Sequence, residues 1–168
     1  MTRLHGKEVA LRPLEERDLP RLAEIMGEPE AARWWGESSV DSLRDDFLGP
    51  DSDSGFAVEV AGSLVGVVSF WEHDEADCRY AGMDIVLGEA HTGRGLGPDA
   101  LRALARHLFG ERGHWRLVID PDAANERAIR AYELVGFRPV GVMRRYQRRR
   151  DGSFRDALLM DLLPEELR

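Results

Sequence analysis

Three glycines lie close together in the segment Gly93-Arg94-Gly95-Leu96-Gly97. The segment follows an apolar stretch, predicted as a strand over residues 80–87, and precedes a helix predicted over residues 98–109. Glycines let an anion approach the backbone closely, and the first turn of a helix directs N–H groups and the positive end of its dipole toward that anion. The spacing is that of neither a dinucleotide-binding loop nor an NTPase loop. We therefore predict a phosphate-binding loop in which Arg94 adds a positive charge.

Two aspartates are candidates for moving a proton. Asp84 lies in the middle of the predicted strand 80–87, and Asp120 directly follows a strand predicted over residues 115–119. Burial in a cleft disfavours the charged form of a carboxylate, so a strand residue such as Asp84 that faces a cleft can have the raised pKa that suits a general base. We favour Asp84 as the base, and the sequence leaves the assignment to Asp120 open.

The elements that must position these residues follow from hydrophobic spacing and from turn residues. Pro98 fits the first turn of the helix after the glycine loop, because its missing N–H is not needed there. The order βααβββαβαββ predicts one α/β (α+β) domain over residues 1–168, with a mixed sheet flanked by helices. The predicted strands are 8–14, 56–60, 64–71, 80–87, 115–119, 137–146 and 154–163, and the predicted helices are 19–26, 40–48, 98–109 and 125–135.

The composition fits one globular domain without a membrane segment. The chain has 168 residues, of which 43% are hydrophobic, enough for a single core. No run of apolar residues is long enough to span a membrane, and the first twenty residues carry charges where a signal peptide has an apolar core, so we expect a cytoplasmic protein. The single cysteine, Cys78, excludes an internal disulfide and a cysteine-rich metal site, and we predict no metal.

Charge differs between the two halves of the chain. Residues 1–80 contain 18 acidic and 8 basic side chains, a net charge of −10, whereas residues 81–168 contain 13 and 15, a net charge of +2. The acidic half disfavours nucleic acid and attracts a cationic small molecule, and the second half tolerates a polyphosphate. An arginine-rich run ends the second half, and a solvated face or phosphate contacts explain it better than an RNA partner does: Arg144, Arg145, Arg148, Arg149 and Arg150.

Together with the glycine loop, the segment from Asn125 to Phe137 resembles the GNAT superfamily of acetyltransferases. Its pattern Asn-x-x-Ala-x-x-x-Tyr-x-x-x-Gly-Phe is matched from Asn125 through Ala128 and Tyr132 to Phe137, and only His91 departs from the pattern of the loop. The resemblance implies a GNAT fold and acetyl-coenzyme A as donor. The donor-binding residues that it implies are Ile85, Val86 and Leu87 for the pantetheine arm, Thr92, Gly93, Arg94, Gly95, Leu96, Gly97 and Pro98 for the pyrophosphate, and Asn125, Ala128 and Tyr132.

Other residues resemble the aminoglycoside 6′-N-acetyltransferases within that superfamily. The likeness runs from about Trp34 to the C-terminus and rests on Trp34-Trp35-Gly36, on Asp120-Pro121 and on the turn Asp151-Gly152. An aminoglycoside carries ammonium groups on sugar rings, which carboxylates and aromatic faces bind. The implied acceptor-binding residues are Trp34, Trp35, Asp77, Asp84, Asp120 and Asp151, although the two tryptophans serve equally well as packing residues.

The resemblance also implies the catalytic roles. One aspartate takes a proton from the amine, Asp84 by preference, while Asp120 holds the ammonium-bearing ring. The backbone N–H of Leu87 binds the oxyanion, and Tyr132 protonates the leaving thiolate.

Two other functions stay open on the sequence. One is a GNAT enzyme that acetylates a protein N-terminus or a polyamine with the same donor machinery. The other is a non-catalytic module that binds coenzyme A or a partner. We expect no nucleic-acid or membrane partner, and the sequence leaves a monomer or a homodimer open.

Overall fold

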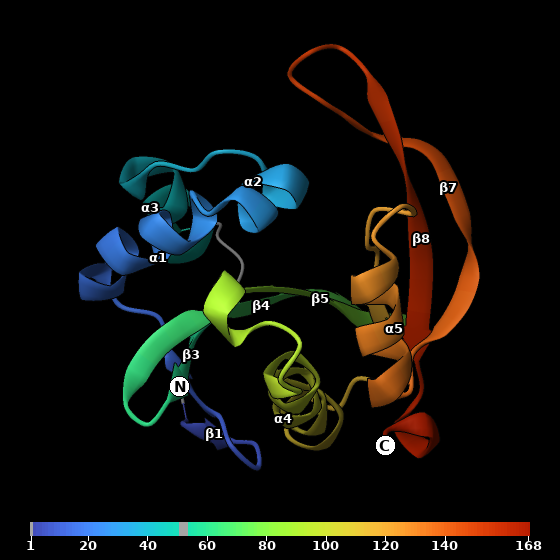
Figure 1. Ribbon diagram of the computed structural model, residues 1–168. Coiled ribbons are helices and arrows are strands. Elements are labelled where there is room, and N and C mark those ends of the chain that lie inside the picture. The colour runs from blue at the N-terminus through green and yellow to red at the C-terminus, as the bar shows by residue number, and fades with distance from the viewer. Residues whose placement is uncertain (1, 51–53) are drawn as a thin grey trace.

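The computed structural model describes residues 2–50 and 54–168, which form an eight-stranded sheet with helices on both faces (Figure 1). The strand order is β1-β2-β3-β4-β5-β6-β8-β7, and only the β5–β6 pair is parallel. The strands are β1 Leu4–His5, β2 Ala10–Pro13, β3 Ser54–Val60, β4 Ser63–Glu75, β5 Cys78–Leu87, β6 Leu117–Ile119, β7 Arg138–Arg148 and β8 Phe154–Leu162. The helices are α1 Leu19–Met26, α2 Pro29–Trp35, α3 Val40–Leu48, α4 Leu96–Gly110 and α5 Glu126–Val135, with short 3-10 turns at Glu16–Asp18, Glu89–His91 and Pro164–Glu166.

Strands β5 and β6 separate in the middle of the sheet. Strand β5 pairs with β4 along its whole length, from Cys78 to Leu87. Across the described residues it pairs with β6 only at Ala81 and Gly82, and β6 ends at Ile119. The second half of β5, which contains Asp84, therefore borders an opening in the sheet.

Two apolar cores fix the helices on the two faces. Helices α4 and α5 pack with the sheet in the larger core, and α1 and α3 pack on the other face around Leu22 and Leu43. Figure 1 shows α1, α2 and α3 above the sheet and α4 below it. Buried aliphatic side chains recur every three or four residues along α4, at Ala100, Leu101, Leu104 and Leu108, which is the spacing of one helix face. None of the described helices is long and apolar enough to cross a membrane.

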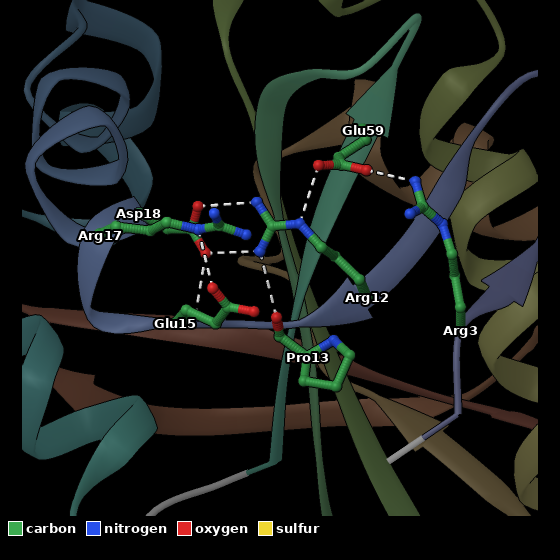
Figure 2. A network of polar contacts seen from close by, with 7 residues as sticks. All are labelled: Arg3, Arg12, Pro13, Glu15, Arg17, Asp18 and Glu59. Atoms are coloured by element: carbon green, nitrogen blue, oxygen red, sulfur yellow. Dashed lines mark hydrogen bonds and ion pairs between the residues drawn. The ribbon is translucent and has the colours of Figure 1, made fainter.

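A network of buried charges ties the first strands to the turn before α1 (Figure 2). The Arg12 guanidinium donates to Asp18 at 2.6 Å and to Glu59 at 2.8 Å, and Arg3 donates to the other oxygen of Glu59. Burial raises the pKa of Asp18, but hydrogen bonds from Arg12 and from the N–H of Glu15 outweigh this and hold its pKa below the usual value. Charges this poorly solvated are stable only when paired, so the network fixes where α1 leaves the sheet.

The predicted fold class is confirmed, and the structure adds two elements. Neither the two-residue strand β1 nor helix α2 was predicted, so Trp34 and Trp35 lie in the last turn of a helix. Helix α4 begins at Leu96, two residues before the predicted start, and β6 begins at Leu117 where residue 115 was predicted.

Candidate active site

The glycine loop leads directly into the first turn of α4. Gly95 is the N-cap residue of α4 and has a φ of 80°, and Gly93 has a φ of 71°. An added Cβ at either position would meet no atom within 4 Å, so the left-handed backbone is what requires glycine there. The first N–H groups of a helix have no partner inside it, and here they face away from the core together. This is the geometry of an anion site at a helix N-terminus.

A cavity of about 340 Å³ lies between this loop, the end of β5 and helix α5. We call it the glycine-loop cavity. Most of the donor-binding residues predicted from the sequence line it: Ile85, Val86, Leu87, Thr92, Gly93, Gly95, Gly97, Pro98, Asn125, Ala128 and Tyr132.

The side chains of two predicted donor-binding residues do not line the cavity. The Leu96 side chain is 2% exposed and packs in the larger core, so only its backbone faces the loop. The Arg94 side chain is exposed and is not part of the cavity wall. The loop motif predicts phosphate contacts for every residue of the segment. In the structure, packing turns the apolar side chain of Leu96 into the core.

Helices α2 and α5 add wall residues that the sequence reasoning missed. Arg127 and Arg130 line the cavity at helical spacing, and Arg127 forms an ion pair of 3.3 Å with Glu30 of α2. Both arginines occupy variable positions of the Asn125-to-Phe137 pattern. Their positive charge was therefore the one sequence feature that could have indicated a role in binding the phosphates. Ala31, Ala131 and Leu134 complete the added wall.

A second cavity, of about 260 Å³, opens where β5 and β6 separate. We call it the aspartate cavity, because Asp84 and Asp120 both line it. It holds four more predicted residues, Trp34, Trp35, Asn125 and Tyr132, and these four also line the glycine-loop cavity. The two cavities therefore adjoin at these residues. The other residues of its wall are Ile119, Pro121, Asp122, Tyr146, Gln147, Arg155, Asp156 and Ala157.

Tyr132 lies in the field of both aspartates. Its side chain is buried, at 9% exposed, and its ring contacts Phe137 edge to face. Burial raises the pKa of the Tyr132 hydroxyl well above its usual value, and the negative charges of Asp84 and Asp120 raise it further. The hydroxyl is therefore a neutral proton donor at physiological pH.

A third cavity, of about 400 Å³, lies on the α3 side of Asp84. This α3 cavity shares Asp84 and Trp35 with the aspartate cavity and carries two further carboxylates, Asp45 and Asp46. No lysine or arginine is among its described wall residues, which are otherwise Met26, Ser38, Leu43, Phe47, Val67, Ser69, Ile85 and Val86. Its carboxylates favour a cationic occupant.

Polar contacts fix the two tryptophans at the end of α2. The Trp34 indole donates to Glu30 at 3.0 Å, and Arg155 of β8 donates to the carbonyl of Trp34 at 2.8 Å. Trp35 is 44% exposed, although it lines all three cavities. Gly36 ends the helix with a φ of 78°. Both tryptophans thus line cavities, and their role in binding the acceptor stays a prediction.

Asp77 and Asp151 lie apart from the cavities. Asp77 is in the turn between β4 and β5, seven residues before Asp84, which is about 20 Å along a strand. Asp151 is in the exposed turn between β7 and β8, where it accepts hydrogen bonds from the N–H and hydroxyl of Ser153. Those bonds lower the pKa of Asp151. Neither residue lines one of the three cavities, because the strands on either side of these turns extend well past them, and a role in binding the acceptor stays a prediction for both.

Two carboxylates on β4 come together with a histidine from the loop between α4 and β6, and none of the three lines one of these cavities. Glu72 accepts from the buried His114 at 2.6 Å and from Arg112, and Asp74 pairs with Arg79 at 3.1 Å. Arginines thus already neutralise the carboxylates that a cation would need.

Gly66 of β4 pairs with Leu87 at the end of β5. A Cβ on Gly66 would stand 2.1 Å from the carbonyl oxygen of Val86 and 2.9 Å from the Cα of Leu87. Gly66→Ala is expected to push β5 away from β4 and to lower the free energy of unfolding by about 1–3 kcal/mol. Denaturant unfolding measures this. Gly141→Ala is the matched control, because its Cβ would meet nothing within 4 Å, and an equal loss in both variants would contradict the packing argument.

Comparison with known proteins agrees with this geometry. The acetyltransferase (GNAT) domain family matches residues 8–138, which is most of the chain. The chain belongs to the GNAT acetyltransferase family. This GNAT chain is 30% identical over 153 residues to aminoglycoside N(6′)-acetyltransferase type 1 of Klebsiella pneumoniae, covering 80% of this chain and 76% of the relative. It is 27% identical over 158 residues to spermidine N(1)-acetyltransferase of Escherichia coli K12, covering 90% and 84%.

A solved structure of an aminoglycoside acetyltransferase has the same architecture. The AAC(6′)-Ib structure in complex with paromomycin and acetyl-CoA superposes with a TM-score of 0.79 at 26% identity, covering 95% of this chain and 96% of that one. The GNAT chain is therefore an acetyltransferase. Its relatives include one enzyme named for aminoglycosides and one named for spermidine.

Proposed function

We propose that this chain transfers an acetyl group from acetyl-CoA to a primary amine of a polycationic small molecule. The first candidate for this amine is the 6′-amine of an aminoglycoside. One observation carries the proposal. The aspartate cavity, with two carboxylates and two tryptophans, adjoins the glycine-loop cavity at Trp34, Trp35, Asn125 and Tyr132. An amine held between Asp84 and Asp120 is thus next to a thioester held at the end of β5.

The donor fits the glycine-loop cavity by its chemistry. The backbone at Gly93 to Pro98 suits a pyrophosphate, and Arg127 and Arg130 add positive charge at the same opening. The polar backbone at the end of β5, residues 85–87, suits the amides of a pantetheine arm. The AAC(6′)-Ib structures hold acetyl-CoA or coenzyme A, which supports the same donor here.

The proposed chemistry divides the work among four groups of the protein. Acetyl-CoA supplies a thioester carbonyl. Asp84 takes a proton from the amine as the new C–N bond forms, and the N–H of Leu87 donates to the oxyanion. As the C–S bond breaks, the neutral hydroxyl of Tyr132 gives its proton to the thiolate. Asp120 holds the acceptor by its charge.

A linear polyamine is the second candidate acceptor, and the α3 cavity favours it. Asp45 and Asp46 form no ion pair within the described part of the chain, so their charge is available to a ligand. Asp84, Asp45 and Asp46 line the same cavity, so a flexible chain with several ammonium groups can contact all three carboxylates. The likeness to spermidine N(1)-acetyltransferase supports the same candidate.

One experiment tests the proposed function. The protein is incubated with acetyl-CoA and a panel of kanamycin, paromomycin, spermidine and a peptide with a free N-terminus, and thiol release is followed. NMR then locates the acetyl group on each product. We expect turnover of the aminoglycosides with acetylation at the 6′-amine. Turnover of the peptide alone would overturn the proposal, and turnover of spermidine alone would select the second candidate.

The α3 cavity gives a prediction of its own. Asp45→Asn/Asp46→Asn is expected to raise KM about fivefold to thirtyfold for acceptors with three or more ammonium groups, because partly exposed charges contribute about 0.5–1 kcal/mol each. KM for a diamine is expected to change less. Asp41→Asn on the same helix is the control, since Asp41 pairs with Arg44 outside the cavity. Equal changes for the diamine and the longer polyamine would contradict a role in binding the distal ammonium.

A further inference from the structure

The pairing of β7 with β8 is interrupted beside the aspartate cavity. Met143 pairs with Ala157, and the next pair is Gln147 with Arg155. Three residues of β7 therefore lie opposite the single residue Asp156. An insertion of this kind bends a strand and redirects its side chains, and such bulges are found next to active sites.

Arg145 at the centre of this bulge has a φ of 53°, which is unusual for a residue other than glycine. Asp156 holds it there, because its carboxylate accepts from the Arg145 N–H at 2.8 Å. The backbone carbonyl of Asp156 also accepts from the N–H of Ala123 at 2.9 Å. Asp156 thus ties the bulge to the loop that carries Asp120. A strained backbone fixed by specific contacts indicates a function for what it positions.

Tyr146 is the residue that the bulge turns toward the cavity. It lines the aspartate cavity together with Asp120, and hydrogen bonding to Asp120 is the largest cause of the raised pKa of its hydroxyl. That bond, partial burial and the charges of Asp120 and Asp84 raise the pKa of Tyr146 to about 12. The hydroxyl therefore donates to Asp120 throughout the physiological pH range. The ring is 55% exposed and stands at the mouth of the cavity.

We propose that Tyr146 is a positioning residue that holds Asp120 toward the ammonium group of the acceptor, and that the bulge at residues 144–146 exists to place it. The proposal rests on the proposed function, because it assigns a cationic amine to the aspartate cavity. Tyr146 acts before chemistry, on the binding of the acceptor. Tyr146 does not line the glycine-loop cavity, so we expect no effect on the binding of the donor.

Tyr146→Phe keeps the ring and removes the donor to Asp120. We expect KM for the cationic acceptor to rise about fivefold to tenfold, as for a lost hydrogen bond to a charged group at a half-exposed site. We expect kcat to stay within about twofold and KM for acetyl-CoA to stay unchanged. Tyr80→Phe is the matched control, because Tyr80 lies on β5 beside Trp71 and outside all three cavities.

Variants of Asp156 test the bulge separately from the hydroxyl. An asparagine oxygen can still accept from the Arg145 N–H, whereas alanine cannot. Asp156→Ala is expected to raise KM for the acceptor as Tyr146→Phe does, and Asp156→Asn is expected to restore most of the loss. Thermal unfolding of each variant shows whether the fold is retained.

Binding measurements separate this proposal from the proposed function. Calorimetry with kanamycin and with spermidine reports the affinity of the wild type and of Tyr146→Phe without turnover. A fivefold to tenfold weaker affinity for whichever amine binds supports the role of Tyr146, even where only spermidine binds. Equal affinity in the two proteins, a loss of kcat without a change in KM, or an equal loss in Asp156→Asn and Asp156→Ala would overturn it. Binding of neither amine to the wild type would overturn both proposals.

Discussion

Asp84→Asn is expected to lower kcat by about 10²- to 10⁴-fold, the usual contribution of a general base. The amide keeps the size of the carboxylate and cannot take a proton. Steady-state thiol release at saturating acetyl-CoA and acceptor measures kcat. KM for acetyl-CoA is expected to stay unchanged, because Asp84 does not line the glycine-loop cavity.

The position of Asp84 is the reason for the size of this effect. It lies in the half of β5 that, among the described residues, does not pair with β6. It lines both the aspartate cavity and the α3 cavity. An amine in either cavity therefore has this carboxylate in its wall. Asp120 lines the aspartate cavity alone.

Asp120→Asn is the variant that separates the two assignments. If Asp84 is the base, Asp120→Asn raises KM for the acceptor and lowers kcat much less than Asp84→Asn does. A larger loss of kcat in Asp120→Asn would reverse the roles of the two aspartates. Asp156→Asn, which changes an exposed carboxylate of the same cavity wall, controls for the general loss of negative charge.

The sequence predicts local features of the site well because their causes are local. The glycine loop that leads into α4, the helix that follows Asn125 and the strand position of Asp84 all depend on residues that are near in the chain. Two aspartates, on β5 and after β6, come together because parallel strands end at the same edge of the sheet.

The features that the sequence did not predict depend on distant contacts. Helix α2 is only seven residues long, and contacts with the turn before the glycine loop hold its start: Glu89 accepts from the N–H of Glu30 at 2.8 Å and donates its own N–H to Glu28 at 2.6 Å. The bulge that turns Tyr146 inward depends on Asp156 of the next strand. No propensity of either segment contains this information.

Strand length explains why Asp77 and Asp151, which the sequence predicts as acceptor ligands, do not line the three cavities. Strand β4 continues to Glu75 and β7 to Arg148, and both hairpins reach beyond the cavities. Turn residues such as Asp151 and Gly152 mark a reversal of the chain, but they do not say how far from the site it occurs. Figure 1 shows the hairpin of β7 and β8 extending far past the rest of the sheet.

Tyr132→Phe is expected to lower kcat by about 10²-fold while KM for both substrates changes less than threefold. Phenylalanine keeps the ring contact with Phe137 and the packing of α5, and removes only the acidic hydroxyl. Two neighbouring carboxylates and burial keep that hydroxyl protonated, so the wild type can give a proton to the thiolate in each turnover. Single-turnover kinetics with pre-bound acetyl-CoA measures the step directly.

The two tyrosines of the site make this prediction sharp. Tyr132 lines both the glycine-loop cavity and the aspartate cavity, whereas Tyr146 lines only the aspartate cavity. The same change from tyrosine to phenylalanine should therefore reduce kcat at residue 132 and raise acceptor KM at residue 146. An unchanged kcat in Tyr132→Phe would remove this residue from the chemical step, and water at the cavity mouth would then have to protonate the thiolate. Rates that fall with increasing pH in Tyr132→Phe, but not in the wild type, would identify hydronium as the replacement donor, because its concentration falls as pH rises, whereas donation by neutral water would not depend on pH.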